Sequence, residues 1–147
     1  MMKLNVMKES EMVDEFINQF SPASLFVREV PVFAKSVDLV KLDLVNQKIT
    51  AIEFKTTKWR KAELQALGSA SAFDFLEICI LKPTTQKCRD IIINECLKQG
   101  IGLYLMDSTT RIIEHLVKPV SRNTFWEMQR NQVLEYVLRR ATNGNSV

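Results

Sequence analysis

Three side chains in the first half of the chain combine two carboxylates with one amine. Glu53 and Lys55 stand two positions apart at the end of an apolar run, residues 49–54, and Asp38 precedes them in a second apolar segment. The β-branched and aromatic residues of the run predict a strand on which Glu53 and Lys55 face the same side. Paired carboxylates suit a divalent cation, and an adjacent ammonium suits a phosphoryl group. The pattern therefore indicates a metal-assisted phosphodiester site.

The hairpin that carries these residues allows a prediction of their geometry. Residues 36–45 have strand composition, and residues 46–47 are the expected turn into the next strand. With a two-residue loop, Asp38 lies opposite Lys55, and Asp38, Glu53 and Lys55 all project from one face. A loop one residue longer would turn Asp38 to the other face, because side chains alternate along a strand.

The rest of the chain alternates between helical and strand patterns. Apolar spacing predicts helices at residues 9–20, 59–70, 84–97 and 121–141, and strands at 25–33, 36–45, 49–54, 74–81, 101–106 and 111–117, the last one short. A hairpin followed by βα units predicts one α/β domain over residues 1–147, with a mixed sheet of about five strands flanked by helices. Its core spans about residues 9–107, and the C-terminal strand and long helix span about 111–141. Pro31 predicts an edge strand or a bulge, because it cannot donate to a ladder.

This order, with Asp38 followed by Glu53-x-Lys55, resembles the PD-(D/E)xK phosphodiesterase superfamily. Residues 27–81 carry the similarity, and the fold it implies is the restriction-endonuclease-like one. The resemblance implies that Asp38 and Glu53 bind Mg²⁺, with Mn²⁺ as a substitute, and that Lys55 positions or activates the attacking water. The implied reaction is in-line hydrolysis that leaves a 3′-hydroxyl and a 5′-phosphate.

Further site residues follow from the same resemblance. A carboxylate of the first helix is expected as another metal ligand; Glu15 is the preferred match, with Glu11 as the alternative. Gln65 matches a glutamine that RecB-like members carry in the helix after the lysine, as a catalytic or supporting residue. Two positions depart from the pattern, because Val37 replaces the proline of the motif and Ser69 replaces a tyrosine of RecB-like members.

A basic cluster follows the strand of Glu53 and Lys55. Lys58, Arg60 and Lys61 stand at the head of the next helix, where they form either ordinary surface or contacts to a phosphate backbone. Trp59 between them is expected to be a packing anchor rather than a base-stacking platform. The formal charge of +3 permits an acidic partner. DNA is the expected partner, with RNA as the alternative.

Composition excludes several other classes of protein. Apolar residues make up 46% of the 147-residue chain and charged residues 25%, which is ordinary for a single globular domain. Cys79, Cys88 and Cys96 lack metal-ligand spacing, so we expect reduced thiols and a cytoplasmic location. His115 is the single histidine and supports neither a zinc site nor a triad, so we expect a structural role. No apolar run approaches the ~20 residues of a membrane span.

These observations predict a Mg²⁺-dependent nuclease, endo- or exonucleolytic, that acts on DNA in repair, recombination or mobile-element processing. The alternative is an inactive nuclease-fold module for nucleic-acid binding or protein assembly, and a third hypothesis is an α/β interaction protein without a nucleic-acid partner. An apolar stripe over residues 125–138 is mainly core, and it also offers a surface for a homodimer.

Overall fold

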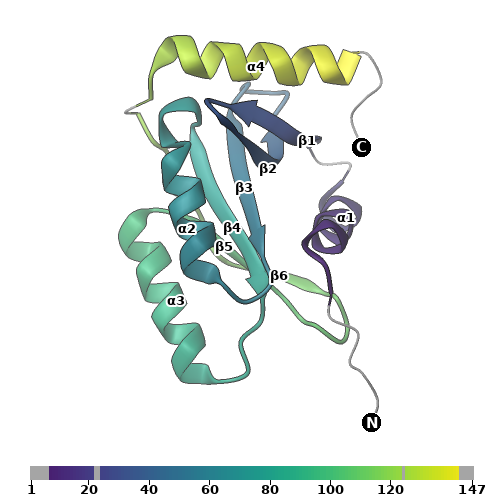
Figure 1. Ribbon diagram of the computed structural model, residues 1–147, viewed down its shortest axis with the longest axis vertical. Helices are drawn as coiled ribbons and strands as arrows, with labels where there is room; N and C mark the ends of the chain where they lie inside the picture. The colour runs from purple at the N-terminus through teal and green to yellow at the C-terminus, as the bar shows by residue number, and fades with distance from the viewer. Residues whose placement is uncertain (1–6, 22–23, 124, 143–147) are drawn as a thin grey trace.

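The computed structural model describes residues 7–21, 24–123 and 125–142 of the chain (Figure 1). The elements in chain order are α1 (Glu9–Phe20), β1 (Leu25–Val32), β2 (Lys35–Leu42), β3 (Ile49–Lys55), α2 (Trp59–Gly68), the 3₁₀ helix η1 (Ala70–Ala72), β4 (Phe75–Leu81), α3 (Gln86–Gln99), β5 (Gly102–Met106), β6 (Ile113–Val117) and α4 (Glu127–Thr142). In this part of the chain, no helix is long and apolar enough to cross a membrane.

The strands form one mixed sheet in the order β1-β2-β3-β4-β5-β6. β1, β2 and β3 are antiparallel; β3, β4 and β5 are parallel; and β6 returns antiparallel to β5. The predicted α/β class is therefore confirmed. The sheet has six strands rather than about five, because the short segment 113–117 pairs with β5, with one register shift between Leu103 and Tyr104. Pro31 lies in the edge strand β1, where its missing N–H leaves no central ladder bond unmade.

Helices cover both faces of the sheet (Figure 1). α1 lies on one side, and α2 and α3 lie together on the other. The apolar stripe of α1 is buried as the sequence predicts, with Phe16 at its centre. The Phe16 ring packs edge-on against Phe26, Phe54 and Tyr104, with ring centroids 5.9, 5.5 and 4.8 Å away. These aromatic contacts from three strands fix where α1 sits and so place its first turn near the end of β3.

Small residues bring α2 close to the opposite face. Ala62 and Ala66 are fully buried there, so the helix backbone approaches the sheet closely. α4 contacts β1 and η1, and buries Val133 and Val137 in the same core. The apolar stripe predicted for the last helix is therefore core at these two positions.

Residues 43–48 separate β2 from β3, and Asp43 bonds to Lys48 around a four-residue loop, residues 44–47, instead of the predicted two-residue loop. The predicted hairpin register is therefore wrong. β2 ends at Leu42, and the Asp43 N–H donates to the Lys48 carbonyl at 3.0 Å. The Gln47 N–H donates back to the Asp43 carbonyl at 2.8 Å, with Gln47 in the left-handed region at φ +57°. Asp43 also accepts from a loop N–H through its side chain. These local bonds favour the longer turn over a two-residue one.

The longer loop shifts the pairing by two positions. β2 and β3 pair from Leu42–Ile49 to Leu39–Ile52, so continuation of the same register leads Asp38 toward Glu53 rather than toward Lys55. A register shift of two residues leaves each side chain on the same face of the sheet, whereas a shift of one residue would turn it to the other face. The wrong register therefore still predicts that Asp38 comes close to the strand end of β3.

The last helix begins at Glu127 rather than at residue 121. The described residues just before it have no regular secondary structure, and two of their backbone N–H groups bind carbonyls of η1 and of the residue before β4. The Arg122 N–H donates to the Asp74 carbonyl at 2.8 Å, and the Trp126 N–H donates to the Ser71 carbonyl at 2.7 Å. Such partners are distant in sequence, and helical spacing does not reveal them.

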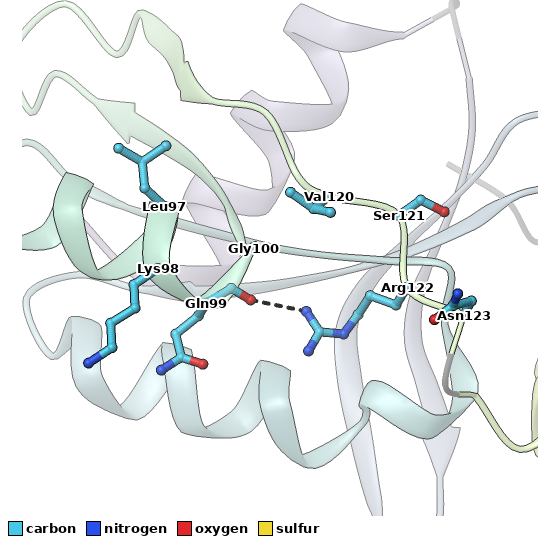
Figure 2. Close-up of a pocket in the computed structure, with 8 residues that line it drawn as sticks. All are labelled: Leu97, Lys98, Gln99, Gly100, Val120, Ser121, Arg122 and Asn123. Atoms are coloured by element: carbon cyan, nitrogen blue, oxygen red, sulfur yellow. Dashed lines mark hydrogen bonds between the residues drawn. The ribbon is translucent and has the colours of Figure 1, made fainter.

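The same segment closes the C-terminal end of α3 (Figure 2). The Arg122 guanidinium donates to the Gln99 carbonyl at 3.2 Å, and Gly100 ends the helix in the left-handed region at φ +70°. A hollow of about 350 Å³ lies between residues 97–100 and 120–123. The Arg122 guanidinium supplies a donor for a carbonyl at the C-terminal end of α3, as a C-capping group does. The residues around this hollow therefore have a structural role, because they hold the segment against the end of the helix.

A buried ion pair fastens α4 to the sheet. Asp74 is 1% exposed, and the Arg130 Nε and Nη2 atoms lie 3.0 and 2.8 Å from its two oxygens. Arg130 also donates to the Gln47 carbonyl at 2.9 Å, and the Ile49 N–H donates to Asp74 at 2.8 Å. This network connects α4 with the start of β3 and with the hairpin loop.

Candidate active site

Asp38 and Glu53 meet where the ladder between β2 and β3 stops. Beyond the last pair, Leu39–Ile52, an Asp38 carboxylate oxygen accepts a hydrogen bond from the Phe54 N–H at 2.8 Å. The Asp38 N–H in turn donates to Glu53 Oε1 at 3.4 Å. A side chain thus replaces a backbone carbonyl as the acceptor, which separates the two strands and places both carboxylates in the gap.

The two carboxylates repel each other in a dry environment. Glu53 is 3% exposed, and its pKa is raised to about 8, chiefly by burial and then by the Asp38 charge. Burial also raises the pKa of Asp38, although the Phe54 N–H partly offsets this effect. Lys35 acts on Glu53 in the opposite direction. Near neutral pH the pair therefore holds a proton, or requires a cation in its place.

Lys55 is the last residue of β3 and follows Glu53 by two positions on the same strand. Its side chain is only 21% exposed, and its Nζ lies 3.7 Å from Oε1 of Glu9, the first residue of α1. The first helix therefore does bring a carboxylate to this end of the sheet, but the residue is Glu9. The sequence signal that could have identified Glu9 is its position in the first turn of α1. This turn lies near the end of β3, because α1 packs on that strand.

Glu11 and Glu15 lie elsewhere on α1. Glu11 is 3.5 Å from Nη2 of Arg111, and Glu15 accepts a hydrogen bond from Gln19 at 3.5 Å. Both contacts turn away from Asp38 and Glu53, toward the helix surface and the loop before β6. Within the described ranges, no group of three or more acidic, histidine or cysteine residues is arranged to hold a metal ion. The carboxylates that come together are therefore two.

A basic pocket opens next to Lys55. It has a volume of about 230 Å³, and its lining residues are Glu9, Lys55, Thr56, Thr57, Lys58 and Lys61. Two of the three predicted nucleic-acid-binding residues, Lys58 and Lys61, therefore share a pocket with the predicted catalytic lysine. Three ammonium groups face one carboxylate there, so the pocket favours an anion.

Arg60 takes a different position from its two neighbours. Its guanidinium lies over the Trp59 ring, 4.4 Å from the ring centroid, and 3.7 Å from the carboxylate of Glu63. Trp59 is partly buried and packs against the core, as expected of an anchor. Gln65 is partly exposed on α2, and no described hydrogen bond connects it with Asp38, Glu53 or Lys55.

A crevice continues from the basic pocket across the ends of the parallel strands. It measures about 400 Å³, shares Thr56 and Thr57 with that pocket, and extends past Trp59 and Pro83 to Ser108. Crevices outside the carboxyl ends of parallel strands are the usual ligand sites of open α/β sheets. The candidate site therefore adjoins a space large enough for part of a polymeric substrate.

Comparisons with known proteins show the fold but no established function. No protein-family model and no curated protein matches the chain. A similar structure is that of a protein of unknown function from Silicibacter pomeroyi, with a TM-score of 0.68, 16% identity, and coverage of 95% of this chain and 90% of that one. A repair endonuclease from Pyrococcus abyssi aligns with a TM-score of 0.49 and 16% identity, over 72% of this chain and 50% of its own. At 16% identity, the likeness to the protein from Silicibacter pomeroyi concerns the architecture.

Proposed function

We propose that this protein is a metal-dependent nuclease of the PD-(D/E)xK type that hydrolyses phosphodiester bonds in DNA. One observation carries the proposal: Asp38 and Glu53 are held together, largely out of water, at the strand end that also carries Lys55. A buried carboxylate beside a half-buried one is costly without a cation, and groups with such perturbed pKa values are concentrated at functional sites.

The donor set fits Mg²⁺. This ion prefers hard oxygen ligands, and it is commonly bound by one or two carboxylates, with water and substrate phosphate completing its shell. Asp38 and Glu53 would hold it, and Mn²⁺ is the expected substitute. When bound, such an ion supplies Lewis-acid polarisation of a phosphoryl oxygen. It would also remove the repulsion that raises the pKa of Glu53.

The lysines of the basic pocket bind and orient the substrate in this proposal. Lys55 follows Glu53 by two positions on β3, and its ammonium would stabilise negative charge on the phosphoryl group that is attacked. Lys58 and Lys61 line the same pocket and would contact a flanking phosphate. The adjoining crevice offers room for the neighbouring nucleotide. In-line attack by water would then leave a 3′-hydroxyl and a 5′-phosphate.

A second candidate function is a nucleic-acid-binding module without turnover. Two observations favour it: Lys55 already pairs with Glu9, and no third carboxylate joins Asp38 and Glu53 in the described residues. A module of this kind would bind DNA through Lys58 and Lys61 with a marked dependence on salt and would not cleave it. The roles in repair, recombination or mobile elements, the homodimer and the cytoplasmic location stay predictions.

Cleavage of end-labelled DNA with Mg²⁺ or Mn²⁺ tests the first function against the second. We expect Glu53→Gln and Lys55→Met each to lower the cleavage rate by about a hundredfold or more, as loss of a group that acts on transition-state charge does. Glu135→Gln and Lys87→Met are matched controls on exposed helix surface, and we expect both to retain the native rate. Equal rates in all five proteins would contradict the assignment.

Metal binding provides an independent measurement. Calorimetric titration with Mn²⁺, without DNA, should show one class of site in the native protein and in Glu135→Gln, and a much weaker site in Glu53→Gln. Salt-sensitive DNA binding without metal affinity or cleavage would instead support the binding module.

A further inference from the structure

Glu77 is a further buried carboxylate, and the proposed nuclease site does not use it. It is 0% exposed in β4, with β3 and β5 on either side. It pairs with Ile52 across β3, whose side chain packs beneath α1. Glu77 therefore lies on the face of the sheet that α1 partly covers, whereas Glu53, one residue further along β3, faces the other way. An ionised carboxylate in this position requires specific partners.

Side chains from three other strands surround Glu77. The Tyr104 hydroxyl donates to Oε1 at 3.2 Å, the Lys41 Nζ lies 3.6 Å from Oε1, and the His115 Nε2 lies 3.3 Å from Oε2. Burial and the Glu77 charge raise the pKa of Tyr104 well above its usual range, so the phenol remains a donor. Oε2 accepts no well-aligned hydrogen bond from the described residues.

The backbone leaves space for this carboxylate. Gly102 stands opposite Glu77 on β5, and a Cβ added at Gly102 would lie 2.7 Å from Oε2 and 2.8 Å from Cγ of Glu77. Any larger residue would displace the carboxylate. The glycine and the four-strand arrangement therefore form a shaped polar site.

Glu77 also orients the imidazole of His115. The imidazole stacks on the Tyr104 ring, with centroids 4.1 Å apart and planes 12° apart, and its Nε2 is directed at Glu77. Nδ1 is consequently on the far side of the ring from the carboxylate. Donation from Nε2 to Glu77 and from Nδ1 to an outside acceptor requires the imidazolium form, in which both nitrogens carry hydrogen.

His115 and Lys41 belong to the wall of an open pocket. It has a volume of about 330 Å³, and its lining residues are Lys41, Asp43, Asn46, Lys48, Thr50, Phe75, Glu77, His115, Lys118 and Pro119. No residue of α1 lines it, so this end of the sheet face stays uncovered. Three ammonium groups and an imidazole face two carboxylates, of which Glu77 is already engaged by Lys41, Tyr104 and His115. The Lys48 Nζ also lies 3.9 Å from an oxygen of Asp74, outside the pocket lining. The remaining surface favours an anion.

We propose that this pocket binds a phosphomonoester group. Such a group is close to a dianion at neutral pH and presents three acceptor oxygens, which matches Lys48, Lys118 and the outward nitrogen of His115. Glu77 would act as a positioning residue that holds Lys41 and His115 in place. The pocket is also large enough for a sugar attached to the phosphate. Both a free mononucleotide and the 5′-phosphorylated end of a nucleic-acid strand present this group.

His115 is the single histidine of the chain, so its imidazole NMR signals report on the pocket without assignment ambiguity. We expect them to shift saturably when inorganic phosphate replaces chloride at constant ionic strength, with a chelator present to prevent cleavage. Lys118→Gln should weaken the affinity for phosphate about five- to tenfold. Lys87→Gln, an exposed lysine on α3, is the matched control and should leave the affinity unchanged.

Two oligonucleotides and a nucleoside monophosphate identify the source of the phosphate. A 5′-phosphorylated strand that shifts the His115 signals more strongly than its 5′-hydroxyl twin supports recognition of a strand end, and a response to the mononucleotide alone supports a free nucleotide. The proposal would be overturned if the His115 signals did not move with tens of millimolar phosphate. It would also be overturned if the 5′-hydroxyl strand bound as tightly as the 5′-phosphorylated one, or if Lys118→Gln and Lys87→Gln had equal effects on the affinity for phosphate. None of these outcomes depends on nuclease activity.

Discussion

The carboxylate of Asp38 accepts a hydrogen bond from the backbone N–H of Phe54, at 2.8 Å, just beyond the last ladder pair of β2 and β3. This contact places Asp38 beside Glu53, since the side chain fills the position of a backbone acceptor. The site therefore depends on a local departure from regular pairing, as is common where strands carry functional residues.

Hydrogen exchange should reveal this contact. Asp38→Ala leaves the Phe54 N–H without its acceptor, so we expect its exchange to accelerate at least tenfold. Asp38→Asn retains an acceptor oxygen and should largely preserve the protection. The Asp43 N–H, which binds the Lys48 carbonyl in the same hairpin, serves as the reference amide. Equal protection of Phe54 in all three proteins would contradict the role of Asp38.

The Asp38–Glu53 pair should make stability fall as the pH rises. The pKa of Glu53 is about 8 in the folded protein against an ordinary value of 4.5, so the folded state binds the proton more tightly than the unfolded state does. Between about pH 5 and pH 8 the free energy of unfolding therefore decreases, by on the order of 2 kcal/mol, and it levels off above that range. Urea denaturation of the native protein and Glu53→Gln over this range measures the difference.

Comparison of the native protein with Glu53→Gln separates the effect of Glu53 on stability from that of other titrating groups. Burial and Glu95 also raise the pKa of Glu63, to about 7, and this group acts in the same direction in both proteins. We expect the Glu53→Gln curve to be flatter and to lie above the native curve at pH 8. Mn²⁺ should recover stability at that pH in the native protein only. Parallel curves for the two proteins would exclude the raised pKa of Glu53.

Arg130 should matter far more for stability than a surface arginine on the same helix. Arg130→Met leaves the buried Asp74 carboxylate without its bidentate partner, and loss of one member of a buried pair typically costs about 3–5 kcal/mol. Arg139 pairs with Glu135 on the helix surface, where its side chain is 64% exposed. Arg139→Met should therefore cost less than about 1 kcal/mol.

Guanidinium denaturation of these two variants provides the measurement. Similar losses in both would show that the Asp74 network does not fasten α4. Loss of the α4 contacts alone, with the sheet intact, would appear as a separate early transition in Trp126 fluorescence, because this residue directly precedes the helix.

The sequence was sufficient for the elements and for the neighbourhood of the site. Periodicity identified the α-helices and strands of the described chain but not the 3₁₀ helix η1, because burial of one face imposes a repeat that depends only on local geometry. Gly100 indicated the end of α3. Pro31 left an edge position or a bulge open for β1, and the sheet shows the edge position. Glu53 and Lys55 could be placed at a strand end for the same reason.

Tertiary structure decided what these residues touch. The hairpin register depended on whether two or four residues form the loop, and the side chain of Asp43 contributed to that choice through hydrogen bonds that no apolar pattern records. Glu9, rather than Glu15, reached Lys55 because the packing of Phe16 fixes how far α1 extends. The neighbours of Glu77 come from three other strands. Contacts of this kind depend on the assembly of the whole sheet, so only the folded chain defines them.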